Sequence, residues 1–438
     1  MKTVLDLENE NDFVAFEKIL MQSHTRTYQL SRNSIHSIID VLVSVGKLWK
    51  VGGLNYLTAL EHLNFNTGFS DSMNRMSLAI IPKLLSRKSL YARVKAEFKN
   101  IDCLDGFLSI DDYKGRLFYA PKGTLLHVTA GNVFLGCIDS IVMGCLTKNT
   151  SLIKLSSQNK YLPGLFMQSL IEADSDSLLT PNVLLLAWKG GNQKIEERLK
   201  SQVDCIIAWG GEKMVENYSK NLPPRVDLIS HGPKISFQVL SKDFICRSKD
   251  DLYSQLAQDI LMWDQSACSN AQNIFLEEGV DVNLFNEKLA MALAAAKYPR
   301  GVKSGDEYVE LLKDYQEGLY QEFETGYKTF LGGDFQIQFD HEYLTPCALN
   351  RSVKVKTFKN SFELSQMLRE FSFYLQTCAL GATYNERASY QKDLSLAGVN
   401  RIVEPGKMLS MLDGSPHDGN LPLVELTRMT ADEASESF

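Results

Sequence analysis

The sequence lacks the features that mark several protein classes. Its 438 residues carry a formal net charge of −7, whereas proteins that track nucleic-acid phosphates carry clustered Lys and Arg. No apolar run approaches the roughly 18 residues of a membrane span. The first ten residues become acidic where a signal peptide needs an apolar stretch. We therefore expect a cytoplasmic protein with no nucleic-acid partner and no membrane span.

Signatures of disulfides and metal sites are also missing. The chain has eight cysteines, but no Cys-x-x-Cys pair and no Cys/His cluster at metal-ligand spacing. Scattered thiols in a chain of this length are typical of a reducing compartment. We therefore expect neither disulfides nor a metal. There is also no internal repeat and no Gly-x-Gly-x-x-Gly dinucleotide fingerprint.

The distribution of apolar residues predicts an α/β protein. Apolar residues near the N-terminus, such as Ile35, Ile38 and Leu42, recur at helical spacing. Further along, short β-branched runs alternate with amphipathic segments, a pattern typical of a doubly wound parallel sheet. A second α/β block and a turn-rich tail follow. The expected parts are a helical N-terminal region packed on the next domain, a Rossmann-type domain, a second α/β domain, and a C-terminal loop and tail: 1–115, 116–234, 235–400 and 401–438.

Cys268 is the candidate nucleophile. It lies in the segment DQSACSN at 264–270, among small and polar residues, whereas most of the other cysteines lie in apolar segments. A thiol becomes a useful nucleophile when backbone dipoles or a nearby cation lower its pKa, and this requires a polar, partly open turn. A buried and inert cysteine is the alternative interpretation.

Candidate binding residues follow the strands predicted in 116–234. Asn132 comes after a predicted strand, where its amide could donate to a developing oxyanion, although an Asn at such a place is often only a turn residue. Lys154 closes the next strand, within reach of a ribose or phosphate. Gly210 and Gly211 precede a predicted helix whose N–H groups favour a pyrophosphate, although glycine is also common in any tight turn.

Together these segments resemble the aldehyde dehydrogenase superfamily, and within it the LuxC-type acyl-thioester reductases, the reductase component of the fatty-acid reductase of bacterial bioluminescence. The resemblance covers roughly residues 115–425. It rests on WDQSAC at 263–268, HVTAGNVF at 127–134 and SSQN at 156–159. It implies an aldehyde dehydrogenase-like fold, with a nicotinamide-cofactor domain at 116–234 and a catalytic domain carrying the nucleophilic cysteine at 235–400.

The resemblance also implies roles for individual residues. Cys268 matches the catalytic cysteine of the family, and Asn132 its oxyanion asparagine. Lys154 matches the lysine on the adenosine ribose, and Glu342 the glutamate on the nicotinamide ribose, although Leu344 and Thr345 replace the Phe and Gly of that motif. The other implied cofactor-binding residues are Ser156, Ser157, Gly210 and Gly211.

Two departures from the family pattern are informative. Ser230 stands where oxidising members carry the glutamate that activates water, so an acyl group on Cys268 is expected to resist hydrolysis. Ser157 stands where members that prefer NAD often carry a ribose-chelating glutamate, which favours NADPH, with NADH as the alternative. His231 is a candidate proton donor, although a histidine beside a Gly-Pro turn is more often structural.

The resemblance therefore implies NADPH-dependent reduction of an activated acyl group to the aldehyde, through an acyl-cysteine and a thiohemiacetal. The expected substrate is a long-chain acyl group on CoA or on an acyl-carrier or acyl-donor protein. Expected partners are further copies of the chain in a homo-oligomer and an acyl-activating subunit. Two alternatives stay open, namely an acyltransferase that uses the same cysteine without hydride transfer and a non-catalytic acyl-binding subunit.

Overall fold

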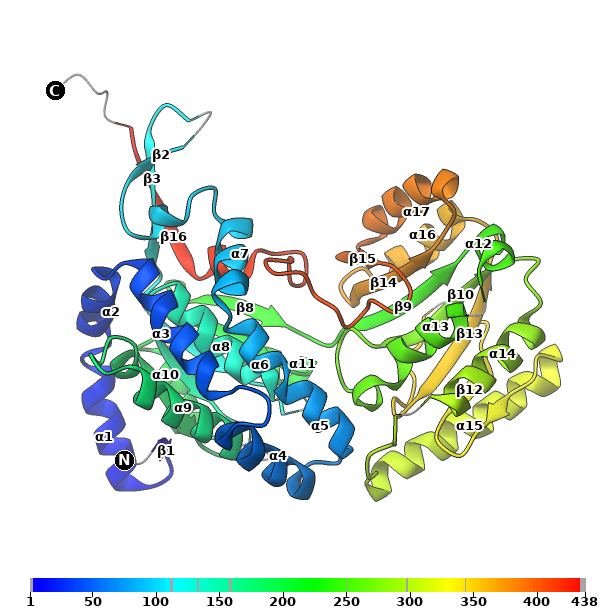
Figure 1. Ribbon diagram of the computed structural model, residues 1–438, viewed down its shortest axis with the longest axis horizontal. Helices are drawn as coiled ribbons and strands as arrows, with labels where there is room; N and C mark the ends of the chain where they lie inside the picture. The colour runs from blue at the N-terminus through cyan, green and yellow to red at the C-terminus, as the bar shows by residue number, and fades with distance from the viewer. Residues whose placement is uncertain are drawn as a thin grey trace. The chain divides into compact units, whose positions relative to one another are not determined.

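The structure, a computed structural model, describes residues 3–110, 113–131, 134–156, 160–249, 251–296, 298–342 and 344–433. The chain forms two compact units (Figure 1). Unit 1 comprises 1–62, 76–232 and 412–438, and unit 2 comprises 63–75 and 233–411. Helices α4 (Leu54–Asn66) and α5 (Asp71–Leu78) contribute residues to both units.

The elements of unit 1, in chain order, are β1 (Val4–Asp6), α1 (Glu10–Leu20), α2 (Ser23–Ser31), α3 (Ile35–Leu48), α6 (Ile80–Leu84), α7 (Arg87–Glu97), η1 (Ile101–Leu104), β2 (Leu108–Ser109), β3 (Arg116–Pro121), β4 (Thr124–Val128), α8 (Leu135–Leu146), β5 (Thr150–Lys154), α9 (Tyr161–Ala173), η2 (Thr180–Asn182), β6 (Val183–Ala187), α10 (Gln193–Lys200), β7 (Cys205–Trp209), α11 (Glu212–Ser219), β8 (Asp227–His231), α18 (Pro422–Glu425) and β16 (Thr427–Asp432).

The main sheet of unit 1 is parallel and has the order β1-β6-β5-β4-β7-β8. Strands β4 and β6 are buried along their whole length, as expected when helices cover both faces of a parallel sheet. Helices α1, α10 and α11 pack on one face, and α8 lies against the side chains of His127 and Ser151 on the other. The chain runs outward from β4 in both directions, so the carboxyl ends of β4 and β7 flank the switch point of the sheet. The expected Rossmann-type arrangement is confirmed.

Some strands of unit 1 were not expected from the sequence. The three-residue strand β1 pairs with β6 and extends the sheet, although the first 115 residues were expected to be mostly helical. In the tail, expected to be loop, β16 pairs antiparallel with β3 in a three-stranded sheet of order β16-β3-β2. These short strands lack a clear alternating pattern of their own, and partners distant in sequence stabilise them.

The elements of unit 2 are β9 (Ile235–Leu240), α12 (Lys242–Arg247), α13 (Asp251–Leu261), η3 (Met262–Gln265), β10 (Ala271–Glu277), α14 (Val282–Ala295), α15 (Gly305–Thr325), β11 (Phe330–Leu331), β12 (Gln336–Phe339), β13 (Ser352–Phe358), α16 (Ser361–Arg369), β14 (Leu375–Gly381), α17 (Tyr384–Ala397) and β15 (Arg401–Val403).

Unit 2 is built on a seven-stranded sheet of order β11-β12-β13-β10-β9-β14-β15, in which only the β11–β12 pair is antiparallel. Helices α13 and α14 bury apolar residues against one face, and α16 and α17 against the other. Helix α15 has a clear start and end: Ser304 and Glu307 form a capping box, and Gly326 ends the helix at φ 75°.

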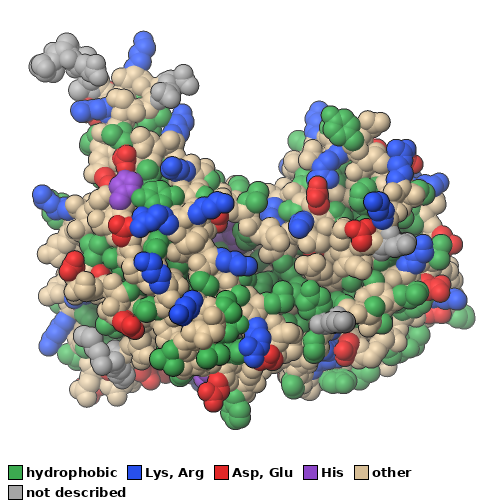
Figure 2. All heavy atoms as spheres, in the orientation of Figure 1, with side chains coloured by type: hydrophobic (Ala, Val, Ile, Leu, Met, Phe, Trp, Pro, Cys, Tyr) green, Lys and Arg blue, Asp and Glu red, His purple; other side chains and the backbone are tan. Residues whose placement is uncertain are grey.

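Basic and acidic side chains both occur over each unit on the face drawn in Figure 2. Across the described ranges, no helix is both long enough and apolar enough to cross a bilayer.

Candidate functional site

Cys268 lies in a turn that is held firmly at the start of β10. The thiol side chain is exposed. On either side of it, Asn270 N donates to Ala267 O and Ala267 N donates to Asn270 Oδ1, both at 3.0 Å. The Asn270 amide is fully buried and also donates to the carbonyls of Asp259 and Met262. The turn therefore presents the thiol to solvent on a backbone that has little freedom to move.

The segment before this turn has an uncommon backbone. Trp263, Asp264 and Gln265 have φ angles of 50°, 47° and 64°, in the left-handed region that residues other than glycine seldom adopt. Such a conformation persists only where the surroundings enforce it. The buried Gln265 amide does so in part, because it donates to the carbonyls of Ala271 and Ser352, each at 2.7 Å.

A second segment with left-handed backbone angles is hydrogen-bonded to the first. Leu349, Asn350 and Arg351 have φ angles of 55°, 53° and 69°, and Asn350 N donates to Asp264 O. The Arg351 Nε donates to Asp264 Oδ1 at 2.6 Å, and both side chains are nearly fully buried. The other carboxylate oxygen of Asp264 accepts from Gly301 N. A buried ion pair thus joins the two runs directly before the nucleophile turn.

Hydrogen bonds also connect the cysteine to Arg401 along the amino ends of three strands. Ser236 Oγ donates to Cys268 O at 2.7 Å, and Thr377 N donates to Ser236 Oγ at 3.2 Å. Arg401 Nη1 then donates to Thr377 Oγ1 at 3.2 Å. Parallel pairing of β9, β14 and β15 aligns these residues at one edge of the sheet.

Arg401 is a functional candidate that the sequence analysis missed. Its guanidinium is fixed by the carbonyls of Lys407, Met408 and Ser410. Burial lowers the pKa of Arg401, and the nearby charge of Cys268 acts in the opposite direction. An arginine keeps its charge in proteins, so Arg401 is a fixed cation near the thiol. No local motif marks it, because it reaches the cysteine only through strand pairing.

The other cysteines differ from Cys268 in their surroundings, except Cys246, which is exposed on α12. The remaining six are buried. Burial raises the pKa of the Cys103 thiol to about 11 and raises the pKa of four others to about 12, namely those of Cys137, Cys145, Cys205 and Cys347. The pKa of Cys378 is raised as well. These six thiols are poor nucleophiles at neutral pH.

In unit 1, several candidate cofactor residues follow the carboxyl ends of neighbouring strands. Lys154 ends β5, and burial lowers its pKa; its Nζ lies 5.0 Å from the centre of the Trp188 ring. The buried Ser156 Oγ has no hydrogen-bond partner within the described part of the chain. Gly211 is the N-cap of α11, and the space where a Cβ would lie is open. Gly210 N, by contrast, donates to the carbonyl of His231.

An ammonium group, an unsatisfied buried hydroxyl and an open helix N-terminus beside the switch point together suit a dinucleotide. The residues present therefore fit a nicotinamide cofactor. Asn132 and Ser157, the other two residues expected at this edge, lie outside the described residues, so their roles stay predictions.

The structure does not bring Glu342 and Cys268 together. Glu342 follows the carboxyl end of β12, whereas Cys268 precedes the amino end of β10. Strands β12, β13 and β10 run parallel, so the two residues lie toward opposite edges of this sheet. Lys356 Nζ anchors the loop at the far edge by donating to Glu342 O and Asp340 Oδ2.

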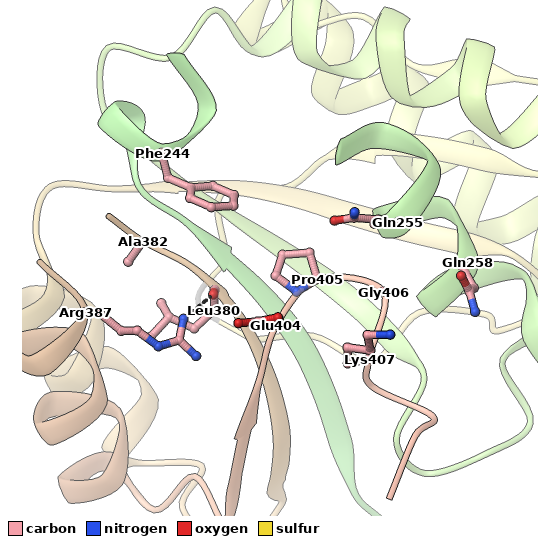
Figure 3. A pocket seen from close by; sticks show the side chains of 10 residues that line it. All are labelled: Phe244, Gln255, Gln258, Leu380, Ala382, Arg387, Glu404, Pro405, Gly406 and Lys407. Carbon is pink, nitrogen blue, oxygen red and sulfur yellow. Dashed lines mark hydrogen bonds between the residues drawn. The ribbon is translucent and has the colours of Figure 1, made fainter. Parts of the chain in front are cut away.

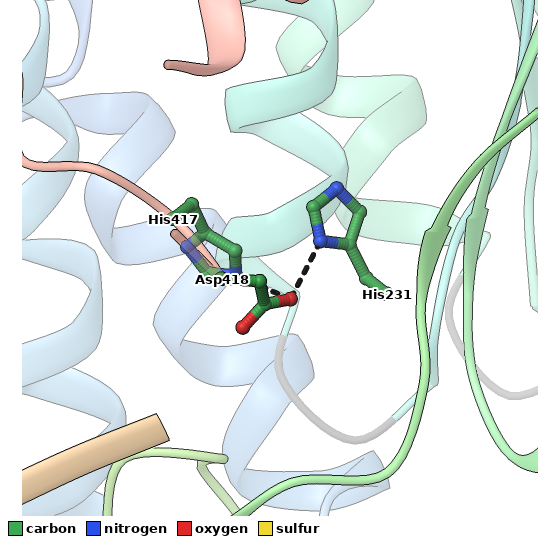
Figure 4. Close-up of side chains that lie close together, drawn as sticks. All are labelled: His231, His417 and Asp418. Atoms are coloured by element: carbon green, nitrogen blue, oxygen red, sulfur yellow. Dashed lines mark hydrogen bonds and ion pairs between the residues drawn. The ribbon is translucent and has the colours of Figure 1, made fainter. Parts of the chain in front are cut away.

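His231 lies at the end of β8 beside Ser230. Ser230 is exposed and His231 is buried, as expected for neighbours on a strand, whose side chains point to opposite faces. The His231 ring stacks on Trp209, with centroids 3.7 Å apart. Its Nδ1 lies 2.7 Å from Asp418 Oδ2, and Figure 4 shows both close to His417. Its role as a proton donor stays a prediction.

A separate pocket of about 540 Å³ lies in unit 2 (Figure 3). Phe244 and Arg387 lie on one side of it and Gln255 on the other, with the loop that follows β15 between them. Cys268 is not among its lining residues, so this pocket is distinct from the thiol site.

Comparison with solved structures identifies the fold. A salicylaldehyde dehydrogenase from Pseudomonas putida G7 superposes with a TM-score of 0.75 at 12% identity, over 97% of this chain and 92% of that one. An NADP-dependent glyceraldehyde-3-phosphate dehydrogenase from Bacillus halodurans C-125 gives 0.74 at 13% identity, over 96% and 90%. Two parallel-sheet units with an exposed thiol at the start of a strand thus define a protein of the aldehyde dehydrogenase fold.

Comparison of sequences identifies the family. The profile of the family described as Acyl-CoA reductase (LuxC) matches residues 30–429. The chain belongs to this family, which confirms the expected resemblance and the expected class of enzyme, an acyl-thioester reductase. The long-chain acyl-protein thioester reductase of Aliivibrio fischeri is 28% identical, over 97% of this chain and 88% of that protein. Its namesake from Vibrio harveyi is 27% identical, over 92% and 84%.

Proposed function

We propose that this protein reduces long-chain acyl thioesters to aldehydes with NADPH, through an acyl group carried on Cys268. The observation that carries the proposal is the exposed thiol, held on a braced turn near the fixed cation Arg401. Relatives over nearly the whole chain are named long-chain acyl-protein thioester reductases, which supports the substrate class.

The first step is acyl transfer to the enzyme. Arg401 favours the thiolate of Cys268, which attacks the thioester carbonyl carbon and expels the thiol of the donor. Negative charge develops on the carbonyl oxygen. The backbone N–H of Cys268 is one donor to it, and the side chain of Asn132 is the second that the resemblance predicts. The product is an acyl-cysteine.

The second step needs a reductant. The chemistry that a bound NADPH would contribute here is the donation of hydride to the acyl carbon. The oxyanion of the resulting thiohemiacetal uses the same two donors; its collapse, with uptake of a proton by the cysteine sulfur, releases the aldehyde and restores the thiol. Lys154, Ser156 and the N-terminus of α11 are the groups that would hold the dinucleotide. The choice of NADPH over NADH rests on Ser157.

The acyl donor and the assembly are further parts of the proposal. The names of the relatives favour an acyl-protein as donor, and acyl-CoA fits the description of the family. We propose a homo-oligomer and an association with an acyl-activating subunit. Size-exclusion chromatography with light scattering, with and without such a subunit, tests both.

Intact-mass analysis tests the nucleophile. Incubation with palmitoyl-CoA should add one acyl mass to the wild type and to Cys246→Ala, which removes the other exposed thiol, but not to Cys268→Ala. Addition of NADPH should then discharge the acyl group as aldehyde. Acylation that persists in Cys268→Ala would refute the assignment. Discharge to another acceptor without NADPH would indicate an acyltransferase, and no acylation at all a non-catalytic acyl-binding subunit.

The role of Arg401 is tested through the pH dependence of the thiol. In Arg401→Gln, the rate of iodoacetamide alkylation at Cys268 should rise with pH about one unit later than in the wild type, because a nearby cation is lost. Arg401→Lys keeps the charge and should restore most of the shift. Equal pH profiles for the three proteins would remove Arg401 from the mechanism.

A further inference from the structure

The loop before α18 presents two potential metal ligands on a tight turn. His417 and Asn420 exchange both backbone hydrogen bonds, each at 2.9 Å. The central residues Asp418 and Gly419 have φ angles of 47° and 84°, as in a type I′ turn. A non-glycine residue in this conformation needs support from its surroundings. The turn directs the side chains of His417 and Asp418 toward His231 at the end of β8 (Figure 4).

The three side chains converge closely enough to share an ion. One ligand atom from each lies within 4.8 Å of the others. His231 Nδ1 is 2.7 Å from Asp418 Oδ2, and His417 Nε2 is 3.8 Å from the same oxygen. Ligands around tetrahedral Zn²⁺ lie roughly 3.4 Å apart, given metal–ligand bonds of about 2.0–2.1 Å. One of the two measured spacings is shorter than that value and the other is longer, so the three side chains would have to shift to hold an ion.

A second observation concerns His417 alone. Its Nε2 is buried and accepts or donates no hydrogen bond within the described part of the chain. An unsatisfied buried polar atom costs free energy, and a metal ion at this position would satisfy it.

The charges around the cluster also favour a cation. The carboxylate of Asp418 is buried beside the two imidazoles, and the half-buried Glu425 interacts electrostatically with His231. Two acidic side chains, those of Asp418 and Glu425, therefore lie at the site.

The basic residues near the cluster are engaged elsewhere. Arg93 is paired with Asp139 through two hydrogen bonds, and Lys122 is paired with Asp227. Neither therefore offsets the negative charge of the cluster fully, whereas a divalent cation would.

We propose that His231, His417 and Asp418 form a binding site for one divalent transition-metal ion, of which Zn²⁺ is the best fit. Two imidazoles and one carboxylate are ligands that Zn²⁺ accepts, and three protein ligands leave one position for water. A bound ion would fasten the loop that leads to α18 and β16 onto the end of β8. This departs from the sequence-based expectation of no metal, which rested on ligand spacing along the chain.

The test uses the full chain with both exposed thiols replaced, Cys246→Ser and Cys268→Ser, so that zinc cannot bind to them. After treatment with EDTA and removal of the chelator, calorimetric titration with Zn²⁺ should give one site per chain, and Zn²⁺ should raise the melting temperature. Asp418→Asn and His417→Gln should weaken binding by more than the roughly 10–100-fold that loss of an outer-shell partner costs. His24→Gln, which changes an exposed histidine outside the cluster, is the control and should bind like the parent.

X-ray absorption at the zinc edge keeps the proposal testable if a variant fails to fold. The parent should show two imidazole ligands with bonds of about 2.0–2.1 Å. No binding to the parent, or equal binding by the parent, Asp418→Asn and His417→Gln, would overturn the site and leave a hydrogen-bonded cluster only. Zinc ligated without imidazole would overturn it as well.

Discussion

The buried ion pair between Asp264 and Arg351 should make a large contribution to the stability of unit 2. Their side chains are 8% and 2% exposed, and Nε to Oδ1 is 2.6 Å. Removal of one partner of such a pair leaves a buried charge uncompensated and costs about 3–5 kcal/mol. Arg351→Met also loses the bond from Arg351 Nη2 to Pro299 O, worth about 1 kcal/mol. We therefore expect Arg351→Met to lower the free energy of unfolding by about 4–6 kcal/mol.

Urea unfolding of the full chain measures this loss, and hydrogen exchange of peptides covering 262–270 and 349–352 locates it. Lys313→Met is the matched control, because it breaks an exposed pair with Glu310, whose side chains are 64% and 60% exposed, and should cost at most about 1 kcal/mol. The double variant Asp264→Asn/Arg351→Met removes both charges and should recover much of the loss.

The same variant should also affect the chemistry. Loss of the ion pair removes a restraint on the left-handed segment before Cys268. The rate of acyl transfer from palmitoyl-CoA should therefore fall by a larger factor than the affinity for NADPH. A loss for Arg351→Met as small as that for Lys313→Met would refute the reasoning. So would local protection of 262–270 that does not change.

Four further predictions concern single positions. Asn132→Ala should slow reduction by roughly 10²–10³-fold with little change in cofactor affinity, as expected for a lost oxyanion donor; single-turnover rates measure this, and a rate within twofold of wild type would contradict it. Ser157→Glu should shift the ratio of kcat/KM from NADPH toward NADH, because a carboxylate repels the 2′-phosphate. Ser230→Glu should introduce hydrolysis of the acyl-enzyme, seen as free acid without NADPH, whereas the wild-type acyl-enzyme should persist. Burial raises the pKa of Glu97 to about 7, so the contribution of Glu97 to the free energy of unfolding should fall as the pH rises from about 4.5 to about 7. Urea unfolding at several pH values measures this trend, which should be absent in Glu97→Gln.

The parallel sheets could be predicted because buried parallel strands carry continuous apolar runs. The runs at 125–128, 152–155 and 183–186 overlap with β4, β5 and β6. Each is flanked by a helix whose apolar residues face the sheet. Strands such as β1 and β15 are only three residues long, so their local signal is weak and pairing with a neighbour determines them.

Some residues of the candidate site could likewise be predicted from local sequence, whereas others could not. Cys268 could be selected because a thiol among small polar residues contrasts with thiols in apolar segments. Arg401 and the pair of Asp264 with Arg351 could not, because strand register and two left-handed runs bring them to the cysteine. The cluster of His231 with His417 was hidden for the same reason, since the residues that form it lie far apart in the chain.

The three-stranded sheet of β2, β3 and β16 has a consequence for synthesis of the chain. Arg116 on β3 pairs with Asp432 on β16, and 316 positions separate them. At about 5–20 residues per second, a ribosome needs roughly 15–60 s to make that stretch. Throughout that interval the outer edge of β3 exposes unpaired backbone N–H and C=O groups, which invite pairing with other chains. Chaperone dependence of the newly made protein should therefore be set by this edge, and slower translation should increase it.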